Sequence, residues 1–159
     1  MTTAAGVLRP TQVPGETFID VPARLRHLAE TSPDATALIE GTATLSSATL
    51  ADAMDRIGGR FPAAGVSPGD VVATLGGVTA DHVALYLGTL AAGAAVATLP
   101  TSAHPDQIAH MAANSGASLL FADEGSMGVA ETLSGIAIRP LDGLIAITAT
   151  AMRAAPRAM

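Results

Sequence analysis

The chain contains no cysteine, no lysine and no tryptophan, and these absences exclude whole classes of chemistry. Without cysteine there is no disulfide framework, no thiolate metal site and no cysteine nucleophile. All eight basic residues are arginines, so no lysine nucleophile, Schiff base or lysine phosphate clamp lies within these 159 residues. The lack of cysteine fits a reducing compartment, and we expect a cytoplasmic protein.

Aromatic residues make up only 3% of the chain and charged residues 14%, whereas 49% are hydrophobic. The interior must therefore be built from Ala, Val, Leu and Ile. The net charge of -6 argues against a nucleic-acid partner, because such proteins carry basic surfaces with aromatic stacking residues. A chain of this length suits one domain that buries roughly 70% of its unfolded surface.

Residues 83–103 carry no formal charge and are long enough to cross a bilayer as a helix. Their content contradicts that reading, because the segment is rich in Ala, Gly and Thr, and Pro100 lies inside it. Gly93 divides the segment where a helix-to-strand turn is needed. We expect a buried helix followed by a strand, and no membrane contact. The first 18 residues lack the pattern of a secretory signal.

The segment from residue 71 to residue 123 alternates short apolar runs with amphipathic segments of helical length. The expected strands are 71–75, 94–100 and 118–123, and the expected helices are 79–93 and 104–116. Thr79 is placed to cap the first of these helices and Gly93 to end it. Strands that alternate with helices pair in parallel. We therefore predict an α/β fold with a mostly parallel sheet flanked by helices.

The rest of the chain divides into shorter elements. A helix capped by Asp20 carries Val21, Leu25 and Leu28 at helical spacing and ends by residues 32–33. A hairpin turns at Gly41-Thr42. Ser46 or Ser47 caps a second helix, whose apolar stripe comprises Leu50, Ala53, Met54, Ile57 and Phe61, and whose last turns are weakened by Gly58, Gly59 and Pro62.

After residue 123 we expect a short helix over 124–133 and one more strand within 141–148. Residues 18–148 should form a single α/β subdomain. We expect residues 1–17 to be loosely ordered and residues 149–159 to fray.

The order of turn and packing residues over about ninety positions resembles the opening of the adenylate-forming superfamily of acyl-CoA synthetases, luciferases and nonribosomal-peptide adenylation domains. The matching residues are Pro33, Asp34, Ala37, Leu38, Leu45, Leu50, Gly65, Val66, Pro68, Gly69, Asp70, Val72, Ala92, Gly93, Ala94, Leu99, Ser115, Gly116 and Ala117. The resemblance covers residues 18–123 well. Departures from the family pattern lie at Ser46, Ser47, Thr49, Gly76, Gly77, Val78, Ala91 and Thr98.

The resemblance implies the N-terminal subdomain of an ATP-dependent acyl-CoA synthetase, which acts on a fatty acid or another carboxylate. The chain stops before the family's phosphate loop, its magnesium-binding acid, its ribose-binding aspartate and its catalytic lysine. We therefore carry over no catalytic, cofactor-binding or metal residue. ATP, magnesium and CoA are expected only for a full-length parent, and the chain alone should be inactive.

Two partner hypotheses follow from this resemblance. The chain packs against the rest of the ligase or a paralogue, or it is a truncated, non-catalytic homologue that self-associates as an interaction module. An apolar surface left by a missing half would serve either role.

Three groups of residues invite a functional interpretation from sequence alone. Gly76-Gly77 before a helix either cradles an anion or forms a plain turn, and we favour the turn because Asp81 adds negative charge there. His82, His104 and His110 lack metal-ligand spacing and are expected to face solvent or cap helices, and His27 to lie on a polar helix face. The pairs Asp52 with Asp55 and Asp123 with Glu124 are interpreted as surface carboxylates rather than catalytic pairs.

Asp70 follows a Pro-Gly turn, and its side chain should form a hydrogen bond with the backbone of that turn.

Overall fold

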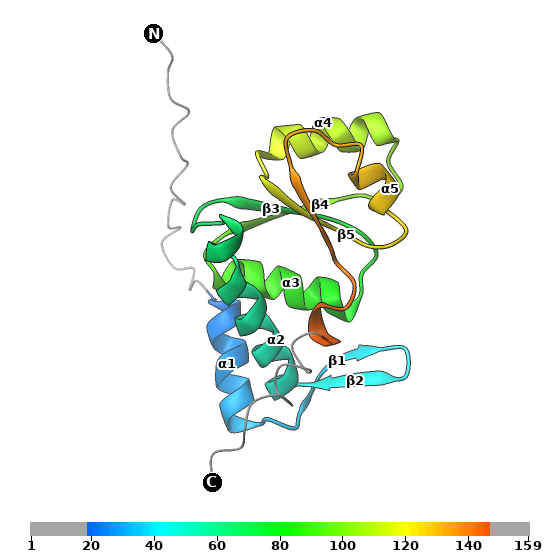
Figure 1. Cartoon of the computed structure of the whole chain (residues 1–159). Coiled ribbons are helices and arrows are strands. Elements are labelled where there is room, and N and C mark those ends of the chain that lie inside the picture. The colour runs from blue at the N-terminus through cyan, green and yellow to red at the C-terminus, as the bar shows by residue number, and fades with distance from the viewer. Residues whose placement is uncertain (1–18, 147–159) are drawn as a thin grey trace.

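The computed structural model describes residues 19–146 and shows a parallel sheet with helices on both faces (Figure 1). The four-stranded sheet has the order β4-β3-β5-β6, and a separate antiparallel hairpin pairs β1 with β2. The helices are α1 (Val21–Thr31), α2 (Ser47–Arg60), α3 (Ala80–Ala91), α4 (Pro105–Ser115) and α5 (Met127–Ala130), with a 3-10 turn at Pro62–Ala64. The strands are β1 (Thr36–Glu40), β2 (Ala43–Ser46), β3 (Val71–Leu75), β4 (Ala95–Leu99), β5 (Leu119–Ala122) and β6 (Ala137–Pro140). The predicted fold class is confirmed.

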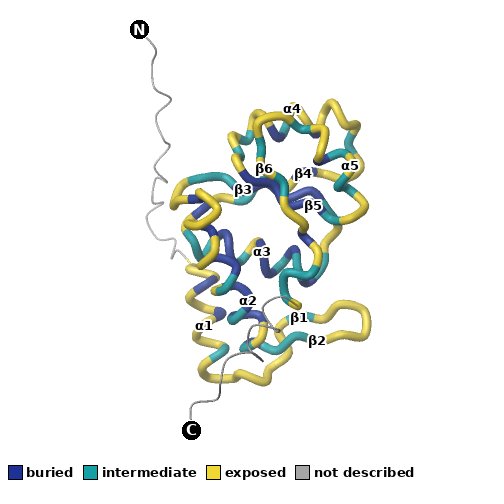
Figure 2. Tube along the Cα trace, viewed as in Figure 1, coloured by how far each residue is buried: buried dark blue, intermediate teal, exposed yellow. Residues whose placement is uncertain are grey.

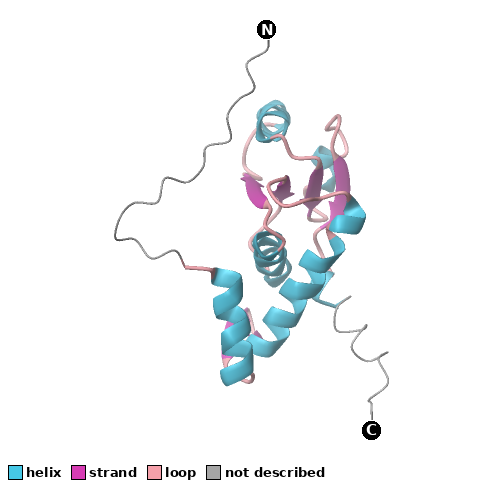
Figure 3. Cartoon of the chain, turned by 90° about the vertical axis from the view of Figure 1, so that its left-hand side faces the viewer, coloured by secondary structure: helices cyan, strands magenta, loops and turns pink. Residues whose placement is uncertain are grey.

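Two apolar layers hold the helices against the sheet, and strand alternation assigns each residue to one of them. On β3, Val72 faces the layer formed with α1, α2 and α3, whereas Ala73 and Leu75 face α4 and α5. On β5, Phe121 and Leu120 divide in the same way. Figure 3 shows the sheet edge-on between its two helix layers. The central strands are almost fully buried, as Figure 2 shows, because neighbours cover both of their faces.

The helix ends follow the capping chemistry expected from the sequence. The side chain of Asp20 accepts a hydrogen bond from the Ala23 amide, that of Ser46 from Thr49, and that of Thr79 from His82. Gly93 follows α3 with a φ of 75°, a left-handed conformation that favours glycine. These predicted boundaries are confirmed.

Two glycines set the closest contact between α2 and α3. A Cβ added to Gly58 would lie 2.8 Å from the carbonyl oxygen of Gly88, and one added to Gly88 would lie 2.9 Å from the Ile57 side chain. The helix continues through Gly58 to Arg60. Glycine at position 58 therefore allows the close approach of α2 to α3, a role that its low helix propensity does not predict.

The strand predicted within residues 141–148 is wrong over the part that the structure describes. The last strand is β6, which ends at Pro140, and residues 144–146 form a helical turn. Gly143 breaks the extended run with a φ of 83°, and the Asp81 carboxylate accepts from the amides of Gly143 and Ile145, both at 2.8 Å. Leu141 is fully buried and serves the core outside a strand.

Residues 147–148, and the predictions for residues 1–17 and 149–159, lie outside the described part of the chain. Within residues 19–146, no helix is long and apolar enough to cross a membrane.

Candidate functional site at the carboxyl edge of the sheet

The sheet has one topological switch point, between the carboxyl ends of β3 and β5. The chain leaves β3 toward β4 on one side and leaves β5 toward β6 on the other. In open parallel α/β sheets, ligands bind in the crevice that this reversal creates. Gly76-Gly77 follows β3 there, and Asp123 follows β5. This is the place where the fold itself predicts a binding site.

The chain's own side chains occupy this crevice. The Asp123 carboxylate accepts from the Gly77 amide at 2.8 Å and from the Ser126 amide at 2.8 Å. A Cβ on Gly76 would lie 2.8 Å from Leu141 Cδ2 and 3.0 Å from Asp123 Cγ, so a larger residue there would require these side chains to shift. The Asp123 carboxylate therefore occupies the position at the turn amides where the phosphate of a ligand would otherwise bind. Its contact with Ser126, and then the Gly77 amide, lower the pKa of its carboxyl group.

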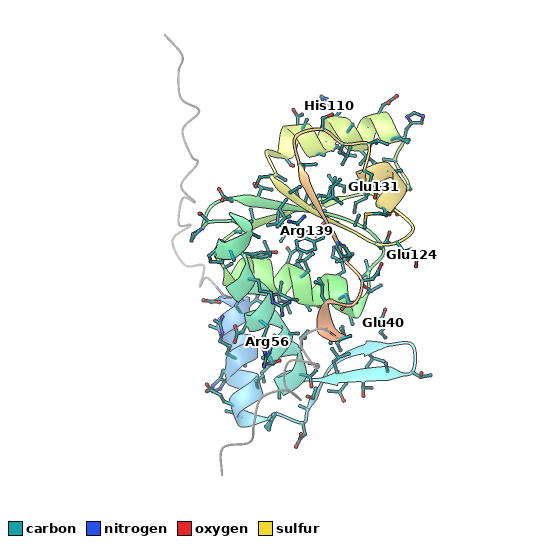
Figure 4. All side chains as sticks on the ribbon, in the orientation of Figure 1. Glu40, Arg56, His110, Glu124, Glu131 and Arg139 are labelled. Atoms are coloured by element: carbon teal, nitrogen blue, oxygen red, sulfur yellow. The ribbon has the colours of Figure 1, made fainter. Side chains whose placement is uncertain are left out.

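The N-terminus of α3 is also supplied with acceptors from within the chain. Glu40 on β1 accepts from the Ala80 amide at 3.0 Å, and Thr79 accepts from the His82 amide at 3.3 Å. Figure 4 shows Glu40 rising from the hairpin beside α3. A phosphate placed here would meet the carboxylates of Glu40 and Asp123 and amides that are already bonded. The geometry fits a plain turn rather than an anion cradle.

His82 is the residue whose place differs most from the sequence interpretation. We expected it to face solvent or cap a helix, but it is 6% exposed. Its Nδ1 lies 2.9 Å from the Gly77 carbonyl oxygen, and its Nε2 lies 3.0 Å from Thr74 Oγ1. Because a carbonyl only accepts, Nδ1 donates to the Gly77 carbonyl, and Nε2 shares a second hydrogen bond with the Thr74 hydroxyl. The His82 ring therefore links the turn after β3, through Gly77, to Thr74 on β3 itself.

A hydroxyl 3.0 Å from an imidazole has the spacing of a nucleophile and its base, but two observations exclude that role for Thr74. Thr74 is fully buried, so no substrate reaches its hydroxyl. The other ring nitrogen of His82 bonds to the Gly77 carbonyl rather than to a carboxylate, so the third member of a catalytic triad is not in place on that side of the ring.

The remaining candidates lie apart from this edge. His104 caps α4 by accepting from the Asp106 amide, as predicted for a capping histidine, and His110 lies on the outer surface of α4 (Figure 4). Asp52 pairs with Arg56 at 2.8 Å, and Asp55 pairs with Arg26 at 2.7 Å, both at least one-third exposed. These pairs are surface ion pairs of small energetic effect.

Three further positions agree with their expected surface or turn roles. Asp70 accepts from the Ser67 amide at 2.7 Å, which confirms its predicted turn contact. His27 and Glu124 are exposed. Within residues 19–146, no group of three or more His, Cys, Asp or Glu side chains is arranged to hold a metal ion.

The fold and this edge define the class of protein. The structure is similar to O-succinylbenzoate Coenzyme A synthetase (MenE) from Bacillus subtilis in complex with AMP, with a TM-score of 0.67 at 22% identity over 77% of this chain. It is also similar to the nonribosomal peptide synthetase FmoA3 in its α-methyl-L-serine-AMP bound form, with a TM-score of 0.70 at 25% identity over 76% of this chain. The fold is that of the N-terminal subdomain of adenylate-forming enzymes.

The family model described as AMP-binding enzyme matches residues 25–153, and the chain belongs to this family. Phenyloxazoline synthase MbtB from Mycobacterium sp. (strain MCS) is 44% identical over 63 residues, or 40% of this chain. The chain spans 5% of MbtB, 32% of the MenE chain and 14% of the FmoA3 chain.

Sequence reasoning missed the Thr74–His82 pair and the structural role of Asp123. One signal was present for each. Thr74 is a single polar residue inside an apolar strand, and Asp123 directly follows a strand that is buried on both faces. Neither signal alone predicts the partner of its residue, and the contact between Asp123 and Gly77 also depends on strand order.

Proposed function

We propose that this chain is the N-terminal scaffold of an enzyme that activates a carboxylate with ATP, and that it is inactive alone. Membership of the AMP-binding family supports the reaction class. The observation that carries inactivity is the switch-point crevice, where Asp123 occupies the turn amide and the chain has no lysine. Phosphoryl chemistry requires cations and free amides on the phosphates. The residues at this edge do not fit the phosphates of ATP.

The parent reaction in this proposal has two steps. A carboxylate attacks the α-phosphorus of ATP, which gives an acyl-adenylate and releases pyrophosphate. A thiol then attacks the acyl carbon and releases AMP. ATP, magnesium and the acceptor thiol would be bound by residues outside this chain.

The acceptor thiol distinguishes two versions of the parent. A fatty-acid or other carboxylate–CoA ligase would use CoA, and a nonribosomal synthetase would use a carrier-protein thiol. The structural likeness to the nonribosomal peptide synthetase FmoA3 favours the second version, whereas the likeness to the Coenzyme A synthetase MenE favours the first. We propose a carrier-linked adenylation enzyme as the parent, because FmoA3 has the higher identity and the higher TM-score of these two structures.

ATP–pyrophosphate exchange tests the inactivity of this chain. The purified 159-residue chain, given a panel of amino, aryl and fatty acids with magnesium, should show no exchange above a protein-free blank. MenE with O-succinylbenzoate serves as the positive control. Exchange by this chain above the blank would show that it holds an ATP site of its own and would refute the proposal.

A further inference from the structure

Asp142-Gly143 is the only aspartate–glycine pair in the sequence, and it lies in the turn that follows β6 at the carboxyl edge of the sheet. Glycine has no Cβ to hinder the approach of its amide nitrogen to the preceding side chain. Attack by that nitrogen on the aspartate Cγ closes a five-membered succinimide ring, which reopens as aspartate or isoaspartate. Asp142 is exposed, so water reaches its carboxyl group. The pair is therefore a candidate site of covalent modification.

Other parts of the chain hold both of the reacting groups. The Glu124 amide donates to Asp142 Oδ2 at 2.8 Å, which directs the carboxyl group toward the end of β5. The Gly143 amide donates to Asp81 Oδ2 at 2.8 Å, which directs the nitrogen toward α3. The nitrogen must leave Asp81, and the carboxyl group must rotate away from the Glu124 amide, before the two can meet. Ring closure therefore requires this turn to open locally.

We propose that Asp142 is a latent isoaspartate site, which the hydrogen bonds to Asp81 and from the Glu124 amide protect in the folded chain. When the turn opens, the Gly143 nitrogen forms a bond to Cγ of the protonated Asp142 carboxyl group. The amide proton leaves with the carboxyl hydroxyl as one water molecule.

A water molecule then reopens the succinimide ring in one of two ways. Attack at Cγ breaks the bond from Cγ to nitrogen and restores aspartate. Attack at the main-chain carbonyl carbon breaks its bond to nitrogen, so that the main chain runs through Cβ and Cγ as isoaspartate. The water that is released in the first step is replaced in the second, so the mass is unchanged and no other reactant is needed. This inference does not depend on the proposed function.

Isoaspartate at this position would disturb the carboxyl edge, because the chain is held on both sides of Asp142. On one side, Leu141 is fully buried and its amide donates to the end of β5 at 2.8 Å. On the other side, two amides of the turn bond to Asp81, both at 2.8 Å. An isoaspartyl link adds one carbon to the main chain between these contacts. We expect the contacts with Asp81 to break, because Leu141 is packed in the core.

The test measures isoaspartate in the purified 159-residue chain during incubation at physiological temperature and pH. Cleavage after glutamate releases the peptide 132–159, in which Asp142 is the only aspartate and which contains no asparagine. Isoaspartate in this peptide is quantified by enzymatic carboxyl methylation with a labelled methyl donor. The test variant is Asp81→Ala. The matched control is Asp70→Ala, because Asp70 also accepts from a turn amide, at 2.7 Å, but at the amino end of β3.

Isoaspartate should form at least about tenfold more slowly in the folded natural chain than in the same chain unfolded in urea, because only the opened turn reacts. Asp81→Ala should raise the rate in the folded chain at least about fivefold, since two hydrogen bonds to a carboxylate are lost, and Asp70→Ala should leave it within about twofold. Circular dichroism verifies that each variant is folded.

Equal rates in the folded and the unfolded natural chain would overturn the proposal, and this comparison needs no variant to fold. An unchanged rate in folded Asp81→Ala would overturn it as well. A lower rate in that variant would identify Asp81 as the base that removes the Gly143 amide proton, which is the opposite of protection. An equal rise in Asp70→Ala would show that general loss of stability, rather than the contact with Asp81, controls the reaction, and would also refute the proposal.

Discussion

Replacing Gly58 with alanine places a methyl group in the closest contact between α2 and α3. The new Cβ would lie 2.8 Å from Gly88 O, 3.6 Å from Gly88 C and 3.7 Å from Ala92 N. All three atoms belong to the backbone of α3 or of its C-terminal cap, so no side-chain rotation can relieve the contact. The two helices must separate, and the packing around Ile57 and Met54 must loosen with them.

Two opposing effects set the magnitude. Alanine in a helix interior is favoured over glycine by about 1 kcal/mol, so helix propensity alone predicts a more stable protein. Overpacking a well-packed contact costs about 1–3 kcal/mol, and a backbone neighbour favours the upper part of that range. The expected net change for Gly58→Ala is a loss of about 1–2 kcal/mol in the free energy of unfolding.

Gly59→Ala is the matched control, because Gly59 is the next residue of the same helix and a Cβ there meets nothing within 4 Å. That variant should gain about 1 kcal/mol. Urea and thermal unfolding followed by circular dichroism compare the two variants. Their melting temperatures should differ by about 4–12 °C, because about 2–3 kcal/mol separates the two variants and each kcal/mol shifts the melting temperature by about 2–4 °C in a domain of this size. Equal stabilisation of both variants would show that the close helix contact is absent, and the reasoning would fail.

Two further predictions concern the turn at the carboxyl edge. His82→Phe leaves the buried Thr74 hydroxyl unpaired and should lower the free energy of unfolding by about 1–3 kcal/mol, whereas adding Thr74→Val should recover part of the loss because both polar partners are then gone. Urea unfolding of the two single variants and the double variant measures these changes. A double variant no more stable than His82→Phe would contradict the hydrogen bond between Thr74 and His82. The pKa of Asp123 is lowered in the folded state, so its contribution is complete above its unfolded pKa of about 3.9 and is lost as the pH falls through the lower folded value. Asp123→Asn should therefore be less stable than the natural chain near pH 7, and the difference should shrink in urea titrations below about pH 4; a difference independent of pH would show that the carboxylate charge plays no part.

The sequence predicted those elements whose signals are local. Thr79 and Gly93 bound α3 because a cap and a left-handed turn depend only on neighbouring residues. The failure at residues 141–148 has a non-local cause, because the apolar pattern of a strand and of a buried turn is the same. Asp81, about sixty residues away along the chain, caps that turn. The packing role of Gly58 could not be predicted for the same reason, since its partner Gly88 lies on another helix.

The candidate site shows the same limit more sharply. From the local sequence, Gly77 is interpreted as a turn residue, His82 as a polar helix residue and Asp123 as a surface acid. Their joint role depends on the strand order β4-β3-β5-β6, which brings the ends of β3 and β5 together. A parallel sheet was predictable from the alternating pattern, but that pattern does not specify which strands are neighbours.

Two carboxylates of the chain itself occupy the switch point, so the chemistry of the proposed parent enzyme should take place elsewhere. Acceptors at this edge come from β1 through Glu40 and from the end of β5 through Asp123, and both bond to amides of the segment that joins β3 to α3. A ligand phosphate would have to displace two carboxylates from those amides and then remain beside them. The chain has no lysine that could offset that repulsion. The carboxylates instead tie the hairpin, α3 and the sheet into one unit, which is the property needed of a scaffold.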